Sequence, residues 1–568
     1  MNRTVYLPKF SDKRDIEEFV DKVAAFERGE IGAEGFRAFR LLRGVYGQRQ
    51  PDVQMFRIKI PFGRVGPEQL DAIADVADLY SRGFGHVTTR QNIQLHFIKL
   101  SDCEALMRRL DEAGLTSREA CGNSVRNVTA CELAEVCADA PFDVTPYAEA
   151  VVRYFLGHPL ASALPRKFKI AFSGCESDCA LAAIHDLGFV AGSRDGRRGF
   201  KVYVGGGLST TPQSALTLHE FLPAEDLSRV CEAVIRMFNE LGNRQNRARA
   251  RIKYVLRKLG EAGFLAKYAE FRAAVDAENP KSLTLPDRLG NSPASPVAGG
   301  VSPSNPNYLE WRASNVIAQK DERYKAVYVK LTLGDITSQQ MRALARALDR
   351  FGDGTIRLTV DQNLLIPWVD ERSLPALYSE LEAMGLGASG IQTARDITSC
   401  PGAESCNLAV TSSRNVARAI GEELTQVDAN PGAGVSVKVS GCPNSCGQHH
   451  IADIGWHGAA KTVNGTTYPM YQLHLGGGVD GAGAHFGRQV VKVISKRVPN
   501  AVSRLLALCE AERQANESPA QFFRRVDPKR VVAVLGDLVA KEPTLGDELD
   551  VGASTGFEVA IGAGECAS

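Results

Sequence analysis

Two stretches of the chain show the same order of apolar and polar positions. Residues 56–62 and 327–333 read FRIKIPF and VYVKLTL, an alternation that is typical of half-buried strands. Each is followed by an amphipathic helical pattern, by a second strand that passes through a Gln-Asn pair, and by another helical pattern at 102–115 or 374–386. This β-α-β-α order predicts half of a ferredoxin-like α/β sandwich in each stretch.

The two stretches are also related residue by residue. Equivalent residues lie 271 positions apart, and the spacing returns at VGGG 204–207 and LGGG 475–478. A spacing kept over this length predicts an internal duplication. The equivalent residues are Gly63 and Gly334, Gln69 and Gln340, the pair Gln91 and Asn92 with the pair Gln362 and Asn363, and Gly114 and Gly385.

A segment rich in Pro, Ser and Gly separates the two copies. Residues 280–306 contain few large apolar side chains and are predicted to be a linker. In the second copy, 432–440 is predicted to be a strand that enters a Cys-rich turn, with 168–173 as its counterpart. We therefore expect an α+β and α/β fold with an N-terminal arm at 1–50, a ferredoxin-like half at 51–120, a larger α/β module at 121–279, the linker at 280–306, a second ferredoxin-like half at 307–395 and a second module at 396–568.

Composition excludes some classes of function. The 568 residues include 67 Lys and Arg and 66 Asp and Glu, a net charge of +1 that gives no support for a nucleic-acid binder or a polybasic membrane protein. The longest apolar runs, such as 532–538, are far shorter than the ~20 residues of a membrane span. The N-terminus has no apolar segment typical of a secretory signal, so we expect a cytoplasmic protein, in which clustered Cys bind metal or serve redox chemistry.

Four of the thirteen Cys form a distinct pattern in the second module. Cys400 and Cys406 are separated by five residues, Cys442 and Cys446 by three, and the two pairs by 35. Four thiolates from two loops suit a [4Fe–4S] cluster, in which each iron takes one soft ligand. A structural zinc site and buried free thiols are the competing interpretations, although zinc sites usually use closer pairs than the first of these.

The first module repeats this pattern with Cys131, Cys137, Cys175 and Cys179. Either these Cys bind a second cluster, or they remain from a duplicated ancestor. Their loops lack the Pro-Gly and Pro-Asn of the second module and carry acidic residues, which would disfavour an anionic cluster, so we expect packing without a cluster. The remaining Cys show no ligand spacing: Cys103, Cys121, Cys231, Cys509 and Cys566.

Several cationic residues occur in otherwise apolar, strand-like sequence. Because a buried cation is costly unless it is paired, they suggest an anionic ligand; an exposed strand face with solvated charges is the alternative. Asp361 replaces Arg90 in the second copy, which fits one active site built asymmetrically. The most basic stretch, 243–258, is interpreted as a solvated helix face, or as a docking patch for an acidic electron-transfer protein. The strand-embedded cations are Arg90, Arg126, Arg166, Lys167 and Lys169.

Seven motifs along nearly the whole chain carry a family resemblance. They are GVYGQRQPDVQMFRIKIPFG at 44–63, TTRQNIQLH at 88–96, VRNVTAC at 125–131, LPRKFKIAF at 164–172, TSCPGAESCNLA at 398–409, SGCPNSCG at 440–447 and LHLGGG at 473–478. With these motifs the chain resembles the sulfite and nitrite reductases that carry a sirohaem coupled to a [4Fe–4S] cluster. The paired Cys motifs and the Arg-Lys-Phe-Lys segment carry the resemblance most specifically.

The resemblance implies a pseudo-two-fold fold. The two ferredoxin-like halves form one domain, and the two larger modules flank it around one sirohaem. It also implies a role for individual residues. The implied cluster ligands are Cys400, Cys406, Cys442 and Cys446, the last of which also binds the sirohaem iron. The implied anion site consists of Arg90, Arg126, Lys167 and Lys169, and the implied sirohaem contacts are Arg90, Arg166, Gln362 and Asn444.

The expected activity is the six-electron reduction of sulfite to sulfide, with nitrite reduction to ammonia as the alternative. Lys169 favours sulfite, because the nitrite branch of the family tends to have Asn at this position. The segment GVYGQRQ resembles ferredoxin-dependent members, and no dinucleotide-binding motif is present, so we expect ferredoxin as the donor in preference to a flavoprotein subunit. A two-cluster electron carrier and a zinc-stabilised scaffold are less favoured hypotheses, since neither explains the strand-embedded cations.

Overall fold

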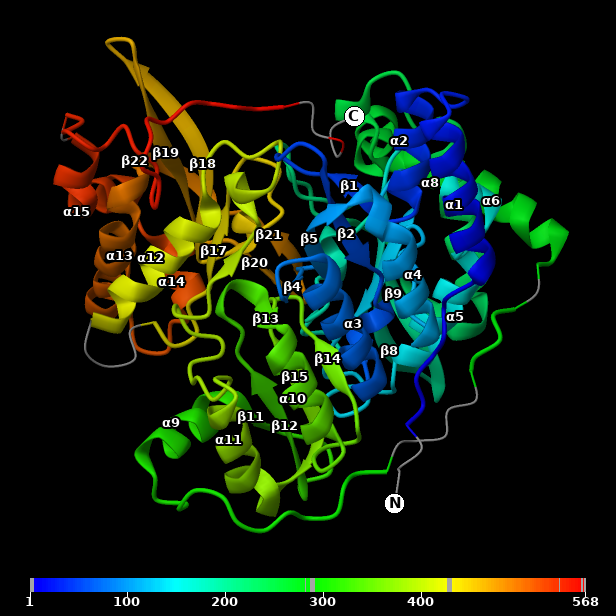
Figure 1. Cartoon of the computed structure of the whole chain (residues 1–568), viewed down its shortest axis with the longest axis horizontal. Helices are drawn as coiled ribbons and strands as arrows, with labels where there is room; N and C mark the ends of the chain where they lie inside the picture. The colour runs from blue at the N-terminus through cyan, green and yellow to red at the C-terminus, as the bar shows by residue number, and fades with distance from the viewer. Residues whose placement is uncertain are drawn as a thin grey trace. The chain divides into compact units, whose positions relative to one another are not determined.

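The computed structural model describes residues 5–280, 282–286, 292–426, 432–540, 542–562 and 565. Cys566, and residues 281 and 287–291 of the predicted linker, lie outside this described part. The chain forms two compact units, whose elements are labelled in Figure 1. The first unit contains Met1–Gly207, Gln213–Leu331 and Asp335–Ala388, and the second contains Leu208–Pro212, Thr332–Gly334 and Ser389–Ser568.

Two five-stranded sheets of the first unit have the same topology. Their orders are β1-β2-β5-β4-β13 and β11-β12-β15-β14-β3, with every neighbouring pair antiparallel. Each sheet takes its last strand from the other copy of the repeat, so the predicted duplicated ferredoxin-like halves are confirmed. The strands are Val45–Gly47 (β1), Val53–Ile58 (β2), Arg64–Val65 (β3), Phe84–Val87 (β4), Ile93–Lys99 (β5), Val316–Ala318 (β11), Tyr324–Val329 (β12), Asp335–Thr337 (β13), Ile356–Leu358 (β14) and Leu364–Asp370 (β15).

The repeated Gln at positions 69 and 340 explains how the first helix of each half begins. Gln69 accepts a hydrogen bond from the Gly66 backbone N–H at 3.3 Å, and Gln340 accepts one from Thr337 at 3.0 Å, which satisfies an N–H that the helix leaves open. The other end of each amide donates to the loop after the second helix of its half. These helices are Pro67–Tyr80 (α3) and Ser338–Leu348 (α10), followed by Cys103–Glu112 (α4) and Leu374–Ala383 (α11).

The strand predicted through each Gln-Asn pair is wrong in one respect. The pair lies in a turn between two antiparallel strands, β4 and β5 or β14 and β15. Gln91 and Gln362 have φ values of 52° and 68°, in the left-handed region, which interrupts a strand. The alternation of apolar residues on both sides of the turn concealed this break.

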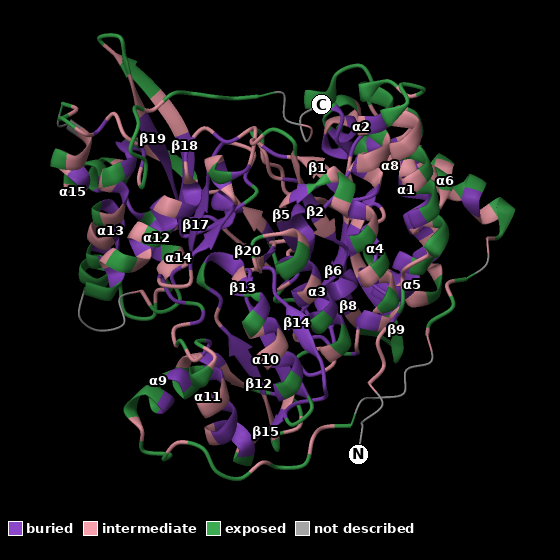
Figure 2. Cartoon of the chain, in the orientation of Figure 1, coloured by how far each residue is buried: buried purple, intermediate pink, exposed green. Residues whose placement is uncertain are grey.

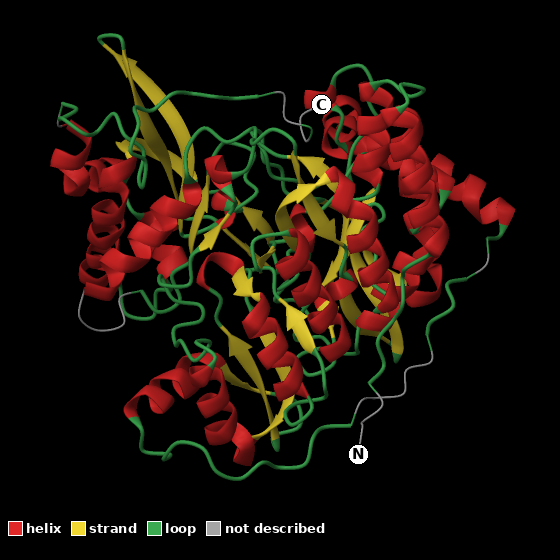
Figure 3. Cartoon of the chain, in the orientation of Figure 1, coloured by secondary structure: helices red, strands yellow, loops and turns green. Residues whose placement is uncertain are grey.

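The remaining sheets belong to the larger modules, one in each unit. Their orders are β10-β9-β8-β7-β6 and β16-β17-β18-β19-β22, and in both the three strands nearest the Cys-bearing edge are parallel. Helices pack against both sheets, and most of the strand residues they cover are buried, whereas the tip of the β18–β19 hairpin is exposed (Figures 2 and 3). The strands are Val125–Ala130 (β6), Phe168–Ser173 (β7), Leu187–Arg194 (β8), Arg197–Val204 (β9), Leu216–Pro223 (β10), Thr398–Ser399 (β16), Val437–Ser440 (β17), Ile454–Val463 (β18), Thr466–Leu475 (β19) and Arg488–Ile494 (β22), with a hairpin of Gly478–Asp480 (β20) and Gly483–His485 (β21).

Helices bury one apolar face against these sheets. In α7, for example, Val230, Val234 and Phe238 recur at helical spacing and are fully buried, and Phe238 lies 5.7 Å from the Phe168 ring. The helices of the first module are Thr145–Phe155 (α5), Pro159–Ser162 (α6), Leu227–Leu241 (α7) and Ile252–Glu278 (α8). Those of the second are Ser413–Gln426 (α12), Val498–Glu512 (α13), Pro519–Arg525 (α14) and Pro528–Ala540 (α15).

The described part of the predicted linker has no helix or strand before Pro306–Asn315 (α9). It is nevertheless fastened to the first unit. The backbone N–H groups of Val297 and Val301 donate to Ser373 and Ser379 at 2.8 and 2.9 Å, beside and within α11. This part of the linker therefore follows a defined path along the second ferredoxin-like half.

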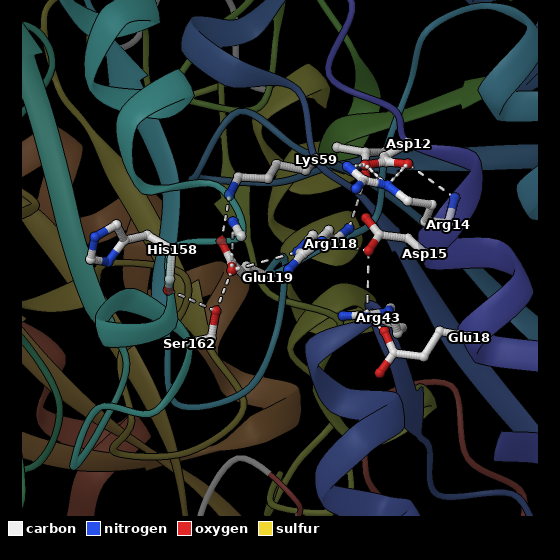
Figure 4. A network of polar contacts seen from close by, with 12 residues as sticks. Asp12, Arg14, Asp15, Glu18, Arg43, Lys59, Arg118, Glu119, His158 and Ser162 are labelled. Atoms are coloured by element: carbon white, nitrogen blue, oxygen red, sulfur yellow. Dashed lines mark hydrogen bonds and ion pairs between the residues drawn. The ribbon is translucent and has the colours of Figure 1, made fainter.

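A partly buried ion-pair network fastens the N-terminal helices, Lys13–Glu27 (α1) and Ala33–Leu42 (α2), to the first unit (Figure 4). Asp15 of α1 lies 3.4 Å from Arg43 and 2.5 Å from Arg118. Arg118 also lies 3.8 Å from Glu119, which is 3.9 Å from the buried Lys59 ammonium. Burial lowers the pKa of Lys59 to about 8, and the charge of Glu119 opposes that shift. Lys59 thus depends on Glu119 for its counter-charge.

We expect Glu119→Gln to destabilise the protein by about 3 kcal/mol, because the buried Lys59 loses its counter-charge while the side chain keeps its shape. The measurement is the midpoint of urea-induced unfolding. Arg14→Ala, which removes an exposed pair with Asp12, is the control and should leave the midpoint unchanged. An unaltered midpoint for Glu119→Gln would contradict this role of the pair.

Candidate active site

Arg90 lies in the turn between β4 and β5, and its side chain contacts residues within β6 and β7. Its guanidinium donates to Thr129 Oγ1 at 3.0 Å, to the Ile170 carbonyl at 3.3 Å, and to the Asn127 carbonyl. Burial, followed by the charges of Arg126 and Arg251, lowers its pKa to about 9. The group therefore remains a cation at neutral pH, and its hydrogen bonds to β6 and β7 fix its position.

His185 contacts the same guanidinium through its Nε2 atom. Its Nδ1 lies 2.6 Å from the Leu181 carbonyl, which can only accept, so Nδ1 carries the proton and Nε2 accepts from Arg90. Burial, followed by the charges of Arg90 and Lys169, holds the pKa of His185 well below its usual range. His185 is thus a neutral residue that orients Arg90.

Asp186 supplies the counter-charge to this group of cations. It accepts two hydrogen bonds from Arg251, at 2.8 and 2.7 Å, and one from the backbone N–H of Lys169 at 2.8 Å. Burial, then the charges of Arg90 and Arg251, hold the pKa of Lys169 well below its usual range. Arg90, Lys169 and Arg251 share Asp186, an arrangement in which a bound anion relieves the repulsion among the cations.

The other predicted anion-site and cofactor residues of the first unit lie near this group. Arg126 donates to the carbonyls of Gly122 and Ala120, and its charge lowers the pKa of Arg90. The charge of Lys167 likewise lowers the pKa of Lys169. Arg166 is buried at the start of the same strand segment. The first unit therefore brings Arg90, Arg126, Lys167 and Lys169 within electrostatic range of one another.

Gln362 occupies the turn of the second ferredoxin-like half that corresponds to the turn of Arg90. Its amide donates to the Val87 carbonyl at 3.0 Å and contacts His86 Nε2 at 3.1 Å, and the side chain is buried. These contacts hold the amide against β4, the strand that precedes Arg90.

Sequence reasoning did not assign four residues to this site. They are the cations Arg251 and Lys253, their counter-charge Asp186 and the neutral His185. The expectation of a solvated face for 243–258 is correct for Arg247 and Arg249, which are exposed, and wrong for Arg251 and Lys253, which are buried. The sequence did contain a signal for the burial of Arg251 and Lys253: apolar residues return after Ala250, and the basic residues begin to alternate with them.

The second unit carries the other predicted Cys set. Cys400 follows β16, Cys406 follows a short 3-10 turn, and Cys442 and Cys446 follow β17. Burial raises the pKa of the Cys442 thiol, and the charges of the other three Cys raise it further, so the four Cys lie within electrostatic range of one another. Cys400 and Cys442 are buried and Cys446 is exposed.

The backbone around these thiols fits an iron–sulfur cluster. The Gly441 N–H donates to Cys400 Sγ at 3.2 Å, the kind of contact that tunes a cluster. A Cβ on Gly441 would lie 2.7 Å from the Thr411 carbonyl, and one on Gly402 would lie 2.4 Å from Ser413 Oγ. Glycine is therefore required at both positions for the two loops to approach.

Asn444 and the C-terminal segment lie close to these loops. The Asn444 Oδ1 accepts from the Ser209 hydroxyl at 3.4 Å, within the second unit. Asp550 accepts from the Ser412 backbone N–H at 2.7 Å, and Gly562 donates to the Asn407 carbonyl at 3.0 Å. The C-terminal segment thus runs beside the loop that carries Cys406.

Four His residues also cluster in the second unit: His449, His450, His457 and His474. Burial lowers the pKa of His457 to about 4 and that of His474 to about 3, so these rings are neutral. Among the described residues, three ligand atoms converge within 4.8 Å only at His449, His450 and His474. Neither set of four Cys therefore has the spacing of a single tetrahedral ion, whose thiolates lie about 3.8 Å apart at Zn–S bonds of about 2.3 Å.

A cluster of cations and a set of four neighbouring thiols are features of an oxidoreductase that uses metal cofactors to act on a small anion. The comparisons agree. The model of the "Nitrite and sulphite reductase 4Fe-4S domain" matches residues 121–275 and 390–564, and that of the "Nitrite/Sulfite reductase ferredoxin-like half domain" matches 46–113 and 317–384. The chain belongs to the nitrite and sulfite reductase family, as its motifs predicted.

Relatives of both kinds resemble the chain along most of its length. The ferredoxin–nitrite reductase of Synechococcus elongatus is 30% identical over 463 residues, 80% of this chain and 85% of the relative. The sulfite reductase [ferredoxin] 1 of Mycolicibacterium paratuberculosis is 29% identical over 486 residues, 84% and 83% of the two chains. The solved structure of the NirA protein of Mycobacterium tuberculosis matches with a TM-score of 0.75 and 27% identity, over 91% of this chain and 97% of that one.

Family membership confirms the predicted enzyme class and cofactors. The chain is an oxidoreductase, and the cofactors of its family are sirohaem and a [4Fe–4S] cluster. None of the described helices is long and apolar enough to span a membrane. The cytoplasmic location and the boundaries of the six regions stay predictions.

We expect Gly441→Ala to abolish loading of the [4Fe–4S] cluster of the second unit, because the added methyl group would collide with the Thr411 carbonyl and displace the loop of Cys442. The measurement is the iron and acid-labile sulfide content per chain. Gly536→Ala is the matched control in the same unit, since a Cβ there meets nothing within 4 Å. Full cluster content in Gly441→Ala would contradict the packing argument.

A second prediction concerns pH. Burial, followed by the charges of Arg251 and Arg257, lowers the pKa of Lys253 to about 7. As the pH rises through this value Lys253 loses its charge, so the affinity of the holoenzyme for an anion should fall. Nitrite is a suitable probe, because its charge is constant from neutral to alkaline pH.

The measurement is the Kd for nitrite, followed by visible absorption, across neutral pH. Lys253→Met should bind more weakly below the transition and lose part of the pH dependence. Lys258→Ala, in an exposed residue of the same helix, should keep the profile of the unmodified protein. A profile that Lys253→Met leaves unaltered would exclude Lys253 as the titrating group.

Proposed function

We propose that the chain catalyses the six-electron reduction of sulfite to sulfide, and that its cluster of cations around Asp186 is the anion site. The observation that carries this proposal is the position of Lys169, whose half-buried side chain lies within electrostatic range of Arg90, Arg251 and Lys167. Sulfite at neutral and alkaline pH carries more negative charge than nitrite and benefits more from an additional cation. Nitrite reduction on the same scaffold is the alternative.

The proposed roles follow from where each residue lies. Cys400, Cys406, Cys442 and Cys446 hold the [4Fe–4S] cluster, and Cys446, the exposed member, also faces the sirohaem iron. Arg90, Arg166, Gln362 and Asn444 contact the carboxylate-rich macrocycle. Its negative charge is a further reason for the excess of cations in the first unit.

When bound, the coupled sirohaem and [4Fe–4S] cluster supply electrons one at a time to the anion. The residues of the chain supply charge and protons. Arg90, held by His185 and by its hydrogen bonds to Thr129 and Ile170, offsets the charge of the anion oxygens without reorganising. Conversion of SO₃²⁻ to HS⁻ and three H₂O consumes six electrons and seven protons, and the departing oxygens must be protonated.

Lys169 and Lys167 are the proposed proton donors at those oxygens. Burial and neighbouring cations hold the pKa of Lys169 well below its usual range, which makes its ammonium a better acid than an exposed one. A Lys that has given up its proton is recharged from solvent between electron transfers.

We propose a ferredoxin as the electron donor. The relatives named above as ferredoxin-dependent support this, together with the GVYGQRQ segment at 44–50. The small positive net charge of the chain places any docking surface in a local patch.

The substrate preference is tested by measuring kcat/KM for sulfite and for nitrite with reduced ferredoxin as the electron donor. We expect sulfite to be preferred, and Lys169→Asn to lower the ratio of sulfite to nitrite by about tenfold, which is about 1.4 kcal/mol of transition-state stabilisation. Lys461→Asn, in an exposed residue of the β18–β19 hairpin, is the control and should leave the ratio unchanged. A preference for nitrite in the unmodified enzyme would establish the alternative.

A further inference from the structure

The four Cys of the first module are drawn together in the first unit. The Cys131 and Cys179 thiols contact each other, and so do the Cys137 and Cys175 thiols. All four are free thiols, and Cys131 and Cys175 are buried. Each contact joins one Cys of the C-x5-C loop to one of the C-x3-C loop, so the two loops meet at their sulfurs.

The first loop is anchored to its sheet in the same way in both modules. The Cys131 N–H donates to the Phe172 carbonyl of β7 at 2.9 Å, and the Cys400 N–H donates to the Val439 carbonyl of β17 at 3.3 Å. Phe172 and Val439 are equivalent in the two copies. Cys131 and Cys400 therefore leave equivalent parallel strand pairs at the same point.

The second loop has the same backbone geometry in both modules. Ser173 Oγ accepts from the Ala180 N–H at 3.1 Å, and Ser440 Oγ accepts from the Gly447 N–H at 3.1 Å. Both loops place the residue before the last Cys in the left-handed region, and again the second residue after it. These φ values are 51° for Asp178 and 59° for Ser445, and 58° for Leu181 and 62° for Gln448.

Close backbone approach preserves this loop in both copies. A Cβ on Gly188 would lie 2.5 Å from the Ala182 carbonyl, and one on the equivalent Gly455 would lie 1.9 Å from that of His449. A relic that had lost its ligand would be free to lose these costly conformations. Retention of the left-handed residues, the glycine and all four thiols indicates that the first loop pair still holds a group.

Most of the acidic residues that argued against a cluster in the first module have carboxylates that are exposed to solvent or hydrogen-bonded elsewhere. Glu176 is exposed. The Asp178 carboxylate accepts from Ser173 Oγ at 2.5 Å and from the N–H groups of Ala182 and Ala183 at 2.7 and 3.0 Å, which directs it toward the following turn. Glu132 accepts from the Tyr328 hydroxyl at 3.4 Å and stays buried near the thiols.

We propose that Cys131, Cys137, Cys175 and Cys179 bind a second iron–sulfur cluster, of the [4Fe–4S] class. Among the described residues no three of these sulfurs lie within 4.8 Å of one another, which favours a cluster over a single tetrahedral zinc ion. The charge of Asp361 reaches Cys179, so the second cluster should be harder to reduce than that of the second unit. The proposal does not depend on whether sulfite or nitrite is the substrate.

The first test is the composition of the holoenzyme, purified without oxygen from a host that makes sirohaem. Two clusters predict about eight acid-labile sulfides per chain and about eight irons beyond those in sirohaem; one cluster predicts about four of each. Titration with a strong reductant, followed by electron paramagnetic resonance, should show a second cluster signal that forms at the lower potential. About four sulfides, or one zinc per chain, would overturn the proposal.

The second test assigns the ligands. Cys137→Ser with Cys175→Ser should lower iron and sulfide by about four each and leave the sirohaem absorption unchanged. Cys121→Ser, in a buried Cys of the same unit away from both loops, is the matched control and should lose nothing. Full metal content in the double variant would overturn the assignment, and if that variant fails to fold, the composition of the unmodified protein decides alone.

Discussion

The hydrogen bonds and ion pairs to Asp186 are the interaction on which the proposed anion pocket depends. A buried cation is costly, and the first unit gathers several beside β6, β7 and the start of α8. Asp186 offsets part of that cost by binding Arg251 through two hydrogen bonds and by fixing the backbone of Lys169. His185, the residue before it, stays neutral and positions Arg90. One carboxylate thus allows a net positive charge to persist inside the protein until an anion completes the balance.

Much of the fold could be predicted from the sequence because the duplication repeats structural requirements as well as residues. Gln69 and Gln340 recur because each begins a helix and binds a later loop. Gln91 and Gln362 recur because each turns a hairpin with positive φ, a conformation that apolar alternation does not reveal, and this is why a strand was expected there. The path of the linker along α11 is fixed by hydrogen bonds from two of its backbone N–H groups, and amino-acid composition does not predict such bonds.

The proposed site was predictable to the extent that its chemistry is local in the sequence. Thiol spacing and cations inside strands are local patterns, and they indicated both parts of the site. Asp186 and Arg251 were not predictable in this way, because their meaning arises only when a loop after β7 meets the start of a distant helix, 65 residues on. The basic stretch 243–258 also contains both exposed and buried cations. Arg249 is exposed and Arg251 is buried, and their residue type does not distinguish them.

Comparison of the two copies shows how one scaffold acquired an asymmetric pocket. Asp453 is the equivalent of Asp186, and it too accepts a hydrogen bond from the backbone N–H of the neighbouring strand, here at Ser436. The equivalent of Lys169 is therefore Ser436, whose hydroxyl binds the same carboxylate, and the equivalent of Arg90 is Asp361. The carboxylate thus has a structural role in both copies, and the cations were added around it in one. Charge diverged while the thiol-bearing loops kept their geometry, which is the outcome expected if both loops still bind a cluster and only one copy binds the anion.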